Sequence, residues 1–428
     1  MDIEYIHSLF LKCNTISIDT RKIGLNSFFV AIKGDNFDAN TFAKEALAKG
    51  ASYVIIDNKD YYIDERSIVV EDSLIALQQL ARYHRNYLKL PIIALTGSNG
   101  KTTTKELINV VLSKKYKTKA TIGNLNNHIG VPLTLLSFNV DTEIGIVEMG
   151  ANHKKEIEFL CEIAQPDYGY ITNFGKAHLE GFGGVDGVIQ GKSEMYQYLS
   201  SNNKVVFVNL EDPIQVQKTN KIKSYSFGVN KENAGVNINH IEANPFVVVN
   251  YSQDRIETHL IGLYNANNVN AAIAIGSYFS VEKEAVKDAL ENYIPENNRS
   301  QLITKGTNEI ILDAYNANPS SMKVAIENFI LLHKKNKIVF LGDMFELGKE
   351  SLGEHKAILD LLINQDAILC YFIGEDFYQN KTEKSNFYFF KNFENFAETI
   401  KNNKFVNNMI LIKGSRGMAL ERTLEFIN

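Results

Sequence analysis

Residues 91 to 107, "PIIALTGSNGKTTTKEL", constrain the fold more than any other stretch of this chain. A short apolar run is followed by a turn with two glycines, and then by apolar residues at helical spacing: Leu107, Ile108, Val111 and Leu112. This order is typical of an α/β unit, in which a buried parallel strand passes directly into a helix. The stretch therefore predicts a mainly parallel sheet that is covered by helices on both faces.

The same turn contains the residue types of a phosphate-binding loop. Such a loop needs small residues that let backbone N–H groups approach the phosphate, a lysine for the β/γ charge and a hydroxyl for Mg²⁺. Gly97, Gly100, Lys101 and Thr102 supply these in order. Leu95 stands where the usual pattern has a further glycine, so we expect a shorter and tighter loop. A chance match at a strand-to-helix turn is the alternative.

Three further residues follow predicted strands or lie near them. Glu148 ends the apolar run "EIGIVE", so its side chain would emerge at the carboxyl edge of the sheet, where α/β proteins bind ligands. His178 follows the strand "YGYITNF", and Lys192 lies on a helix that begins near Val185. The alternatives are a solvated glutamate, a loop histidine and a surface lysine, and periodicity alone does not select Lys192.

Length and pattern predict three units. A chain of 428 residues exceeds what one core usually serves, and we place the units at 1–84, 85–296 and 297–428. All three alternate apolar strands with amphipathic helices, except that residues 222–260 contain short strands without a helix, which predicts an antiparallel flap on the central sheet.

Composition argues for a small partner. The net charge of −5 comes from 45 basic and 50 acidic residues, so the chain has no excess of positive charge of the kind that binds nucleic acid. The three cysteines, Cys13, Cys161 and Cys370, have neither metal-type nor disulfide-type spacing. No apolar run reaches the ~18 residues of a membrane span. We expect a cytoplasmic protein with free thiols that acts as a monomer.

Taken together, these segments resemble the Mur ligase superfamily, ATP-dependent ligases that build the peptide stem of bacterial cell-wall precursors. "TGSNGKTT" is similar to the short phosphate loop of that superfamily. The motifs "NLNNHIGVPLTLL", "DAYNANPSSM", "LGDMFELG" and "LIKGSRGMALE" look like the branch that adds D-alanyl-D-alanine to UDP-N-acetylmuramoyl-tripeptide. "ISIDTRKIGLNSFFVAIKGDNFDAN" is similar to the uridine-nucleotide domain of that branch.

The resemblance implies an α/β fold of three domains: a small uridine-nucleotide domain, a central P-loop domain with a parallel sheet, and a C-terminal Rossmann-like domain. It implies ATP and Mg²⁺ as cofactors, and the tripeptide nucleotide and D-alanyl-D-alanine as substrates. Lys192 matches a lysine that the superfamily carbamylates, which would turn a cation into a metal-binding anion. Tyr264 stands where the family pattern GxHNxxN often has histidine.

The resemblance also implies individual roles. The implied ATP-binding residues are Gly97, Ser98, Asn99, Gly100, Lys101, Thr102, Thr103, Asn265, Asn268, Arg299, Asp313, Tyr315 and Asn318. The implied catalytic residues are Lys101, Glu148, His178, Lys192 and Arg299, and the implied metal ligands are Thr102, Glu148, His178 and Lys192 as its carbamate. The implied substrate-binding residues are Asp19, Thr20, Arg21, Asp38, Asn40, Asn124, Asn127, Asn316, Lys413, Ser415 and Arg416.

The chemistry fits this inventory. A carboxylate does not condense with an amine at a useful rate, whereas an acyl phosphate has a good leaving group, and phosphoryl transfer needs mainly positioning and charge neutralisation. We expect the third unit to close over the second and exclude water. Another amide ligase of the superfamily, a nucleotide-dependent switch and a structural protein are the rival hypotheses. The third residue of the tripeptide, lysine or diaminopimelate, stays open.

Overall fold

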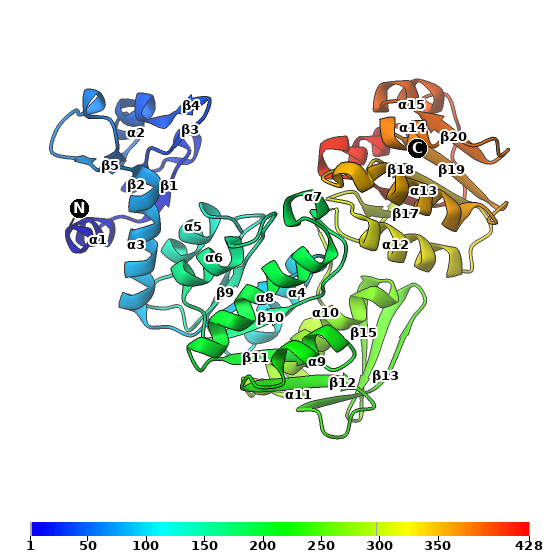
Figure 1. Ribbon diagram of the computed structural model, residues 1–428, viewed down its shortest axis with the longest axis horizontal. Helices are drawn as coiled ribbons and strands as arrows, with labels where there is room; N and C mark the ends of the chain where they lie inside the picture. The colour runs from blue at the N-terminus through cyan, green and yellow to red at the C-terminus, as the bar shows by residue number, and fades with distance from the viewer. Residues whose placement is uncertain (1, 297, 428) are drawn as a thin grey trace.

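The computed structural model describes residues 2–296 and 298–427 and contains three α/β units that follow one another along the chain (Figure 1). Their main sheets have four, nine and six strands. The predicted α/β class is confirmed, including the parallel central sheet. The predicted unit boundaries stay predictions: the one after residue 84 falls within a single helix, and Asn297 lies outside the described residues.

The N-terminal unit contains a parallel sheet of order β1-β2-β5-β6. Its strands are β1 (Thr15–Ser17), β2 (Ser27–Val30), β5 (Ala51–Ile56) and β6 (Ser67–Val69), with a small hairpin of β3 (Lys33–Gly34) and β4 (Phe37–Asp38). Its helices are α1 (Ile3–Phe10), α2 (Ala43–Ala48) and α3 (Ser73–Leu88). Helix α3 begins because the Asp72 carboxylate accepts the Ile75 N–H, and it leads into the central unit.

The central unit contains the sheet β15-β14-β13-β12-β11-β10-β7-β9-β8. Its strands are β7 (Ile92–Thr96), β8 (Thr118–Ala120), β9 (Ile144–Glu148), β10 (Tyr168–Ile171), β11 (Val205–Asn209), β12 (Ser224–Val229), β13 (Val236–Ala243), β14 (Phe246–Tyr251) and β15 (Asp254–Ile261). Only β13, β14 and β15 pair in antiparallel fashion. Because β12 and β13 pair in parallel, the predicted flap continues the main sheet.

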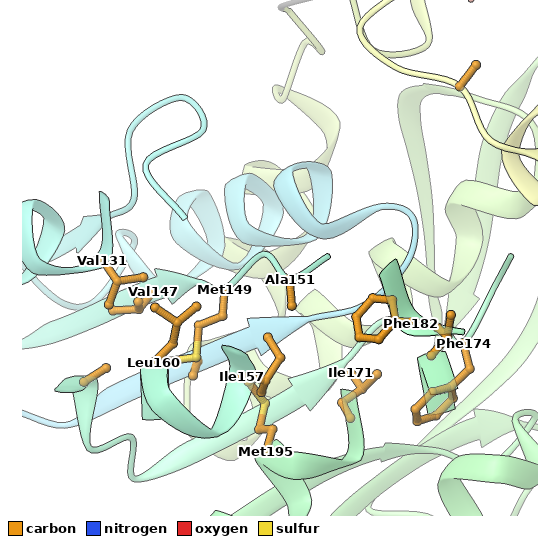
Figure 2. Close-up of a cluster of buried hydrophobic side chains, with 14 of the residues drawn as sticks. Val131, Val147, Met149, Ala151, Ile157, Leu160, Ile171, Phe174, Phe182 and Met195 are labelled. Carbon is orange, nitrogen blue, oxygen red and sulfur yellow. The ribbon is translucent and has the colours of Figure 1, made fainter. Parts of the chain in front are cut away.

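Helices cover both faces of this sheet, which explains why β7 is apolar at nearly every position. Ile92 and Ala94 join the core with α5, α6 and α8, whereas Ile93 and Leu95 join the core with α4, α10 and α11. Figure 2 shows side chains of the first of these cores, among them Val147 of β9, Ile171 of β10 and Phe182. The helices are α4 (Lys101–Leu112), α5 (Gly130–Ser137), α6 (Glu156–Ala164), α7 (Leu179–Phe182), α8 (Val185–Ser201), α9 (Pro213–Thr219), α10 (Ala266–Tyr278) and α11 (Lys283–Glu291).

The C-terminal unit contains the sheet β16-β17-β21-β18-β19-β20, in which only β16 is antiparallel. Its strands are β16 (Gln301–Lys305), β17 (Asn308–Asp313), β18 (Lys337–Gly342), β19 (Ile368–Ile373), β20 (Phe387–Phe390) and β21 (Met409–Lys413). Its helices are α12 (Pro319–Leu331), α13 (Ser351–Leu362), α14 (Glu375–Gln379) and α15 (Phe393–Ile400). The register places Asp313 opposite Lys413, so both side chains reach the carboxyl edge together.

The described residues also agree with two simpler expectations. All three cysteines are free thiols, and Cys161 and Cys370 are buried. Within residues 2–296 and 298–427, no helix combines the length and the apolar character that crossing a membrane requires.

Candidate active site

One large cavity, of about 810 Å³, lies where the carboxyl edge of the central sheet meets residues of the C-terminal unit. This volume is in the range of small-molecule sites. The predicted site residues that line it are Ser98, Asn99, Gly100, Lys101, Thr102, Thr103, Asn124, Asn127, Glu148, His178, Asn265, Asn268, Arg299, Asp313, Tyr315, Asn316, Asn318, Lys413 and Arg416. The fold thus brings most of the predicted residues to one place.

The phosphate loop is shaped by two glycines and braced by the end of β10. Gly97 and Gly100 have φ values of +147° and +76°, which favour glycine. A Cβ at Gly97 would lie 1.9 Å from the Thr172 hydroxyl, so the loop packs too closely for a side chain there. Thr172 donates from Oγ1 to the Asn99 carbonyl at 2.6 Å. Leu95 is fully buried in β7, so the chain turns only after it, as the shorter loop requires.

Lys101 is folded back onto its own loop. Its Nζ donates to the Gly97 carbonyl at 2.8 Å, and burial lowers its pKa, with Glu148 acting against this and Arg299 adding to it. A lysine that has only a backbone carbonyl as its hydrogen-bond acceptor can release it for phosphate oxygens at little cost. The Lys101 ammonium group is therefore available to bind an anion at this loop.

Glu148 is the last residue of β9, and each of its carboxylate oxygens accepts a hydrogen bond. Thr102 donates from Oγ1 to Oε2 at 2.9 Å, and Asn126 donates from Nδ2 to Oε1 at 2.8 Å. A hydroxyl and a carboxylate beside a phosphate loop fit Mg²⁺, which binds through few protein oxygens together with phosphates and water. Among the described residues, no group of three or more His, Cys, Asp or Glu side chains could hold a metal by themselves.

Lys192 is buried in α8 and is not among the residues that line the cavity. Its side chain is one of the largest fully buried in the protein, and its Nζ lies 5.3 Å from the centre of the Phe182 ring. Burial lowers its pKa well below the ordinary value, and the nearby Lys101 lowers it further. Because Gly187 and Gly191 lack side chains, Phe182 can pack against α8 at this point. The buried environment contradicts the surface-lysine alternative.

The C-terminal wall is organised by ion pairing and stacking. Lys413 donates from Nζ to Asp313 Oδ2 at 2.5 Å, and Asp313 Oδ1 accepts the Ser300 N–H at 3.0 Å. The Arg299 guanidinium carbon lies 3.5 Å from the centre of the Tyr315 ring, which is a close cation–π contact. These contacts hold two cationic side chains at the face opposite the phosphate loop.

Comparisons with known proteins identify the family of this chain. Two family models match the chain: the Mur ligase middle domain at residues 95–276 and the Mur ligase, glutamate ligase domain at residues 298–416. The UDP-N-acetylmuramoyl-tripeptide--D-alanyl-D-alanine ligase of Bacillus subtilis is 34% identical over 96% of this chain and 92% of its own length. The chain belongs to the Mur ligase family. The resemblance seen in the sequence is thereby confirmed.

Solved structures of Mur ligases share the whole fold. MurF from Acinetobacter baumannii matches with a TM-score of 0.83 and 30% identity, covering 99% of this chain and 97% of that one. MurF from Thermotoga maritima in complex with ADP matches with a TM-score of 0.83 and 26% identity, covering 97% of each chain. The shared fold therefore covers nearly the whole chain.

Several predicted residues of this Mur ligase lie away from the cavity wall. Gly97 supports the loop, and Ser415 is buried, where its hydroxyl accepts the Phe345 N–H at 2.9 Å. In the N-terminal unit, Arg21 forms an exposed ion pair with Asp19 at 2.8 Å, and Thr20 begins the short helix that Asp19 caps. Their predicted roles stay predictions.

Asp38 and Asn40 of the same unit form a structural network. Asn40 is fully buried, and its Nδ2 donates to Asp38 at 2.7 Å and to Asp57 at 2.6 Å. Its oxygen accepts the Asp57 N–H at 3.0 Å. Because its amide is satisfied within the protein, Asn40 can hold the surrounding loop in shape.

Sequence reasoning missed Asn126, which lines the cavity, and Lys105, which lies buried on the adjoining helix α4. Asn126 lies in the motif "NLNNHIG" between the two predicted asparagines, Asn124 and Asn127, and only the structure shows that its amide holds Glu148. Lys105 lies one helical turn after Lys101, is buried, and donates to the Thr121 carbonyl at 2.8 Å. Its position on the inward face of α4 was the available signal for Lys105, whereas no pattern distinguished Asn126 from its neighbours.

The structure also shows what replaces the family histidine. The Tyr264 hydroxyl lies 2.9 Å from the Ser300 hydroxyl, and burial raises its pKa. Tyr264 lines the cavity beside Asn265 and Asn268. The tyrosine therefore keeps a hydrogen-bonding group at this position, but its hydroxyl is hydrogen-bonded to Ser300 of the C-terminal unit.

Proposed function

We propose that this chain is an ATP-dependent ligase that joins D-alanyl-D-alanine to UDP-N-acetylmuramoyl-tripeptide in peptidoglycan precursor synthesis. The observation that carries the proposal is the large cavity, which the phosphate loop of one unit lines together with Arg299, Lys413 and Arg416 of the next. The printed name of the Bacillus subtilis relative states the same activity. A simple nucleotide switch would not need this cationic wall.

The central unit would bind ATP and its metal. The loop N–H groups and Lys101 would hold the β/γ-phosphates, and Thr102 and Glu148 would hold Mg²⁺. The ion would neutralise charge on the transferring phosphoryl group. The T. maritima structure with ADP supports a nucleotide in this family's fold. His178 and Lys192, the latter as a carbamate, are proposed to serve a second metal position.

The burial of Lys192 supports the carbamate. A buried amine favours its neutral form, and only the neutral amine has a lone pair that can attack CO₂. Attack forms a C–N bond and one C=O bond of CO₂ becomes a C–O⁻ bond, while the amine releases one proton. A carbamate anion therefore replaces a neutral amine, and two protons are released when the count starts from the ammonium cation. The nearby cationic groups, Lys101 in particular, would then stabilise the anion.

The reaction would proceed in two steps that the cavity residues can support. A carboxylate oxygen of the tripeptide attacks the γ-phosphorus and the bond to the β-phosphate oxygen breaks, giving ADP and an acyl phosphate; Lys101 and Arg299 would balance the charge. The amine of D-alanyl-D-alanine then attacks the acyl carbon, the C–O bond breaks, and phosphate and a proton leave. The C-terminal unit closes one side of the cavity, which would limit hydrolysis of the acyl phosphate.

The remaining predicted residues complete the proposal. Asp19, Thr20, Arg21, Asp38 and Asn40 would form the uridine-nucleotide end of the substrate site. Asn124 and Asn127 would lie along the muramoyl-peptide, since they line the cavity on the side of the central sheet. Asn316, Lys413 and Arg416 would receive the dipeptide, since they line the cavity, and Ser415 would serve this end of the substrate site by holding the Phe345 backbone.

One assay tests the proposal. ADP release is measured with UDP-N-acetylmuramoyl-tripeptide and D-alanyl-D-alanine, each alone and both together. We expect substantial ADP release only when both are present, with one phosphate per peptide product. ADP release that is independent of the dipeptide would contradict the ligase and favour a switch. Turnover with glutamate in place of the dipeptide would favour another amide ligase.

A further inference from the structure

The segment "LGDMFELG", residues 341–348, has no role in the proposed reaction. It follows β18 in the C-terminal unit, yet the carboxylate of its Glu346 pairs with Nδ1 of His178 in the central unit. The two residues are 168 positions apart in the chain. The contact therefore joins the proposed metal site to the neighbouring unit, and its functional meaning rests on the proposed metal role of His178.

The backbone on both sides is shaped to make this contact. His178 has φ +52° and Glu346 has φ +63°, a left-handed conformation that is uncommon outside glycine. The Glu180 N–H also donates to the Glu346 carbonyl at 3.4 Å. Strained conformations persist where surrounding structure requires them and often occur at functional sites. The pairing is thus built into both loops.

The pairing leaves one ring nitrogen of His178 available. When Nδ1–H donates to a carboxylate, Nε2 keeps its lone pair, and histidines that bind metals are commonly oriented in this way. His178 lines the cavity, and both Lys101 and Lys192 are close enough to influence its charge. Nε2 is therefore the nitrogen that can serve a metal there.

Stability does not explain the contact. The side chain of Glu346 is 54% exposed, and pairs this exposed contribute about 0–1 kcal/mol. A second interdomain pair, between Lys176 and Glu354 at 2.5 Å, already joins the same surfaces without touching a proposed metal ligand. What distinguishes Glu346 is its partner.

We propose that Glu346 is a positioning residue that holds the metal-binding form of His178 only when the C-terminal unit is docked. Docking then raises metal affinity, and by linkage a metal at His178 favours docking. "LGDMFELG" would be the segment through which docking of the C-terminal unit changes the metal affinity at His178 in the central unit.

The test uses Mn²⁺ with ADP, titrated into the full chain without other substrates and followed by electron paramagnetic resonance. His178→Ala defines the part of the Mn²⁺ binding that depends on this histidine. We expect Glu346→Ala to weaken that part about tenfold. Glu346→Gln keeps an acceptor oxygen for Nδ1–H and should fall between wild type and Glu346→Ala. Glu354→Gln, the matched control at the same surface, should bind as wild type does.

The outcomes separate this inference from the proposed function. If His178→Ala binds Mn²⁺ as tightly as wild type does, His178 is not a metal ligand. The inference about Glu346 is then also contradicted. A loss in His178→Ala with wild-type binding in both Glu346 variants would overturn the inference alone. Tighter binding in Glu346→Ala would also overturn it, since Glu346 would then compete with the metal. Thermal melting confirms folding, and if Glu346→Ala does not fold, Glu346→Gln with wild-type affinity overturns the inference.

Discussion

The central and C-terminal units each contain a fully buried lysine, Lys192 in α8 and Lys413 at the end of β21, but the two lysines have different surroundings. In the C-terminal unit, Lys413 lies 2.5 Å from the carboxylate of Asp313 on the adjacent strand. In the central unit, Lys192 packs beneath Phe182 and forms no ion pair with a carboxylate in the described parts of the chain; its strongest charged neighbour is Lys101. Equal burial therefore leads to different chemistry.

The difference follows from the cost of burying a charge. An ammonium group in the interior must be paired, or it loses its proton. Asp313 supplies a counter-charge to Lys413, which lines the cavity where anionic substrate groups would lie. Lys192 lacks such a partner, so its neutral amine is favoured and can react with CO₂. A lysine's partner thus indicates whether it serves as a fixed charge or as a reactive group.

The largest effect should come from removing the unpaired lysine. Lys192→Ala is expected to lower the rate of ADP release with both substrates by about 100-fold or more, because the proposed carbamate, which would hold a metal ion beside the transferring phosphoryl group, is lost. Formate or acetate should restore part of the rate by occupying the place of the carbamate. Lys192→Arg, which keeps a cation, should be inactive with or without these anions. Full activity in Lys192→Ala would return this residue to a structural role.

Removing the counter-charge of the paired lysine should affect stability. Asp313→Asn leaves Lys413 buried without its partner, which is expected to destabilise the C-terminal unit by about 3 kcal/mol. Differential scanning calorimetry would follow the transition of that unit. The double variant Asp313→Asn/Lys413→Met should recover part of the loss, because the unpaired charge is gone. An unchanged transition in Asp313→Asn would contradict the distinction between the two lysines.

A smaller effect should come from a buried pair of bases in the N-terminal unit. His7 Nε2 lies 2.9 Å from His84 Nδ1, and His84 Nε2 lies 3.0 Å from the Phe138 carbonyl. Burial, and secondarily His84, lower the pKa of His7 from 6.5 to about 4. Because the folded pKa is depressed, stability is complete above about pH 6.5 and is lost as the pH falls towards 4.

Thermal melting at pH 7.5 and pH 5.0 checks this pH dependence. The contribution of His7 should be about 2 kcal/mol at most. His7→Phe fills the same space without a titrating group, so its loss of stability between the two pH values should be smaller than that of wild type. An equal loss in both proteins would show that other groups cause it.

The sequence predicted the strands that are apolar throughout and the helices that follow them. β7, β9, β11 and β18 lie in uninterrupted apolar runs of the sequence, because strands buried on both faces leave such runs. It missed β20 (Phe387–Phe390), whose aromatic residues lie between polar segments at the sheet edge. The sequence predicted residues 222–260 as a flap added to the central sheet, whereas these strands continue that sheet. The parallel pairing of β12 with β13 could not be predicted, because pairing between strands leaves no local sequence pattern.

The sequence by itself determined the phosphate loop and its place between a strand and a helix, since backbone geometry and glycine spacing are local properties. The tertiary structure decided which charged groups are paired: Asn126 holds Glu148, Asp313 neutralises Lys413, and Glu346 reaches His178 across 168 positions. The physical reason is that burial and counter-charge depend on which distant segments pack together. Local sequence patterns do not show which distant segments come into contact, although these contacts determine the chemistry of each lysine and histidine.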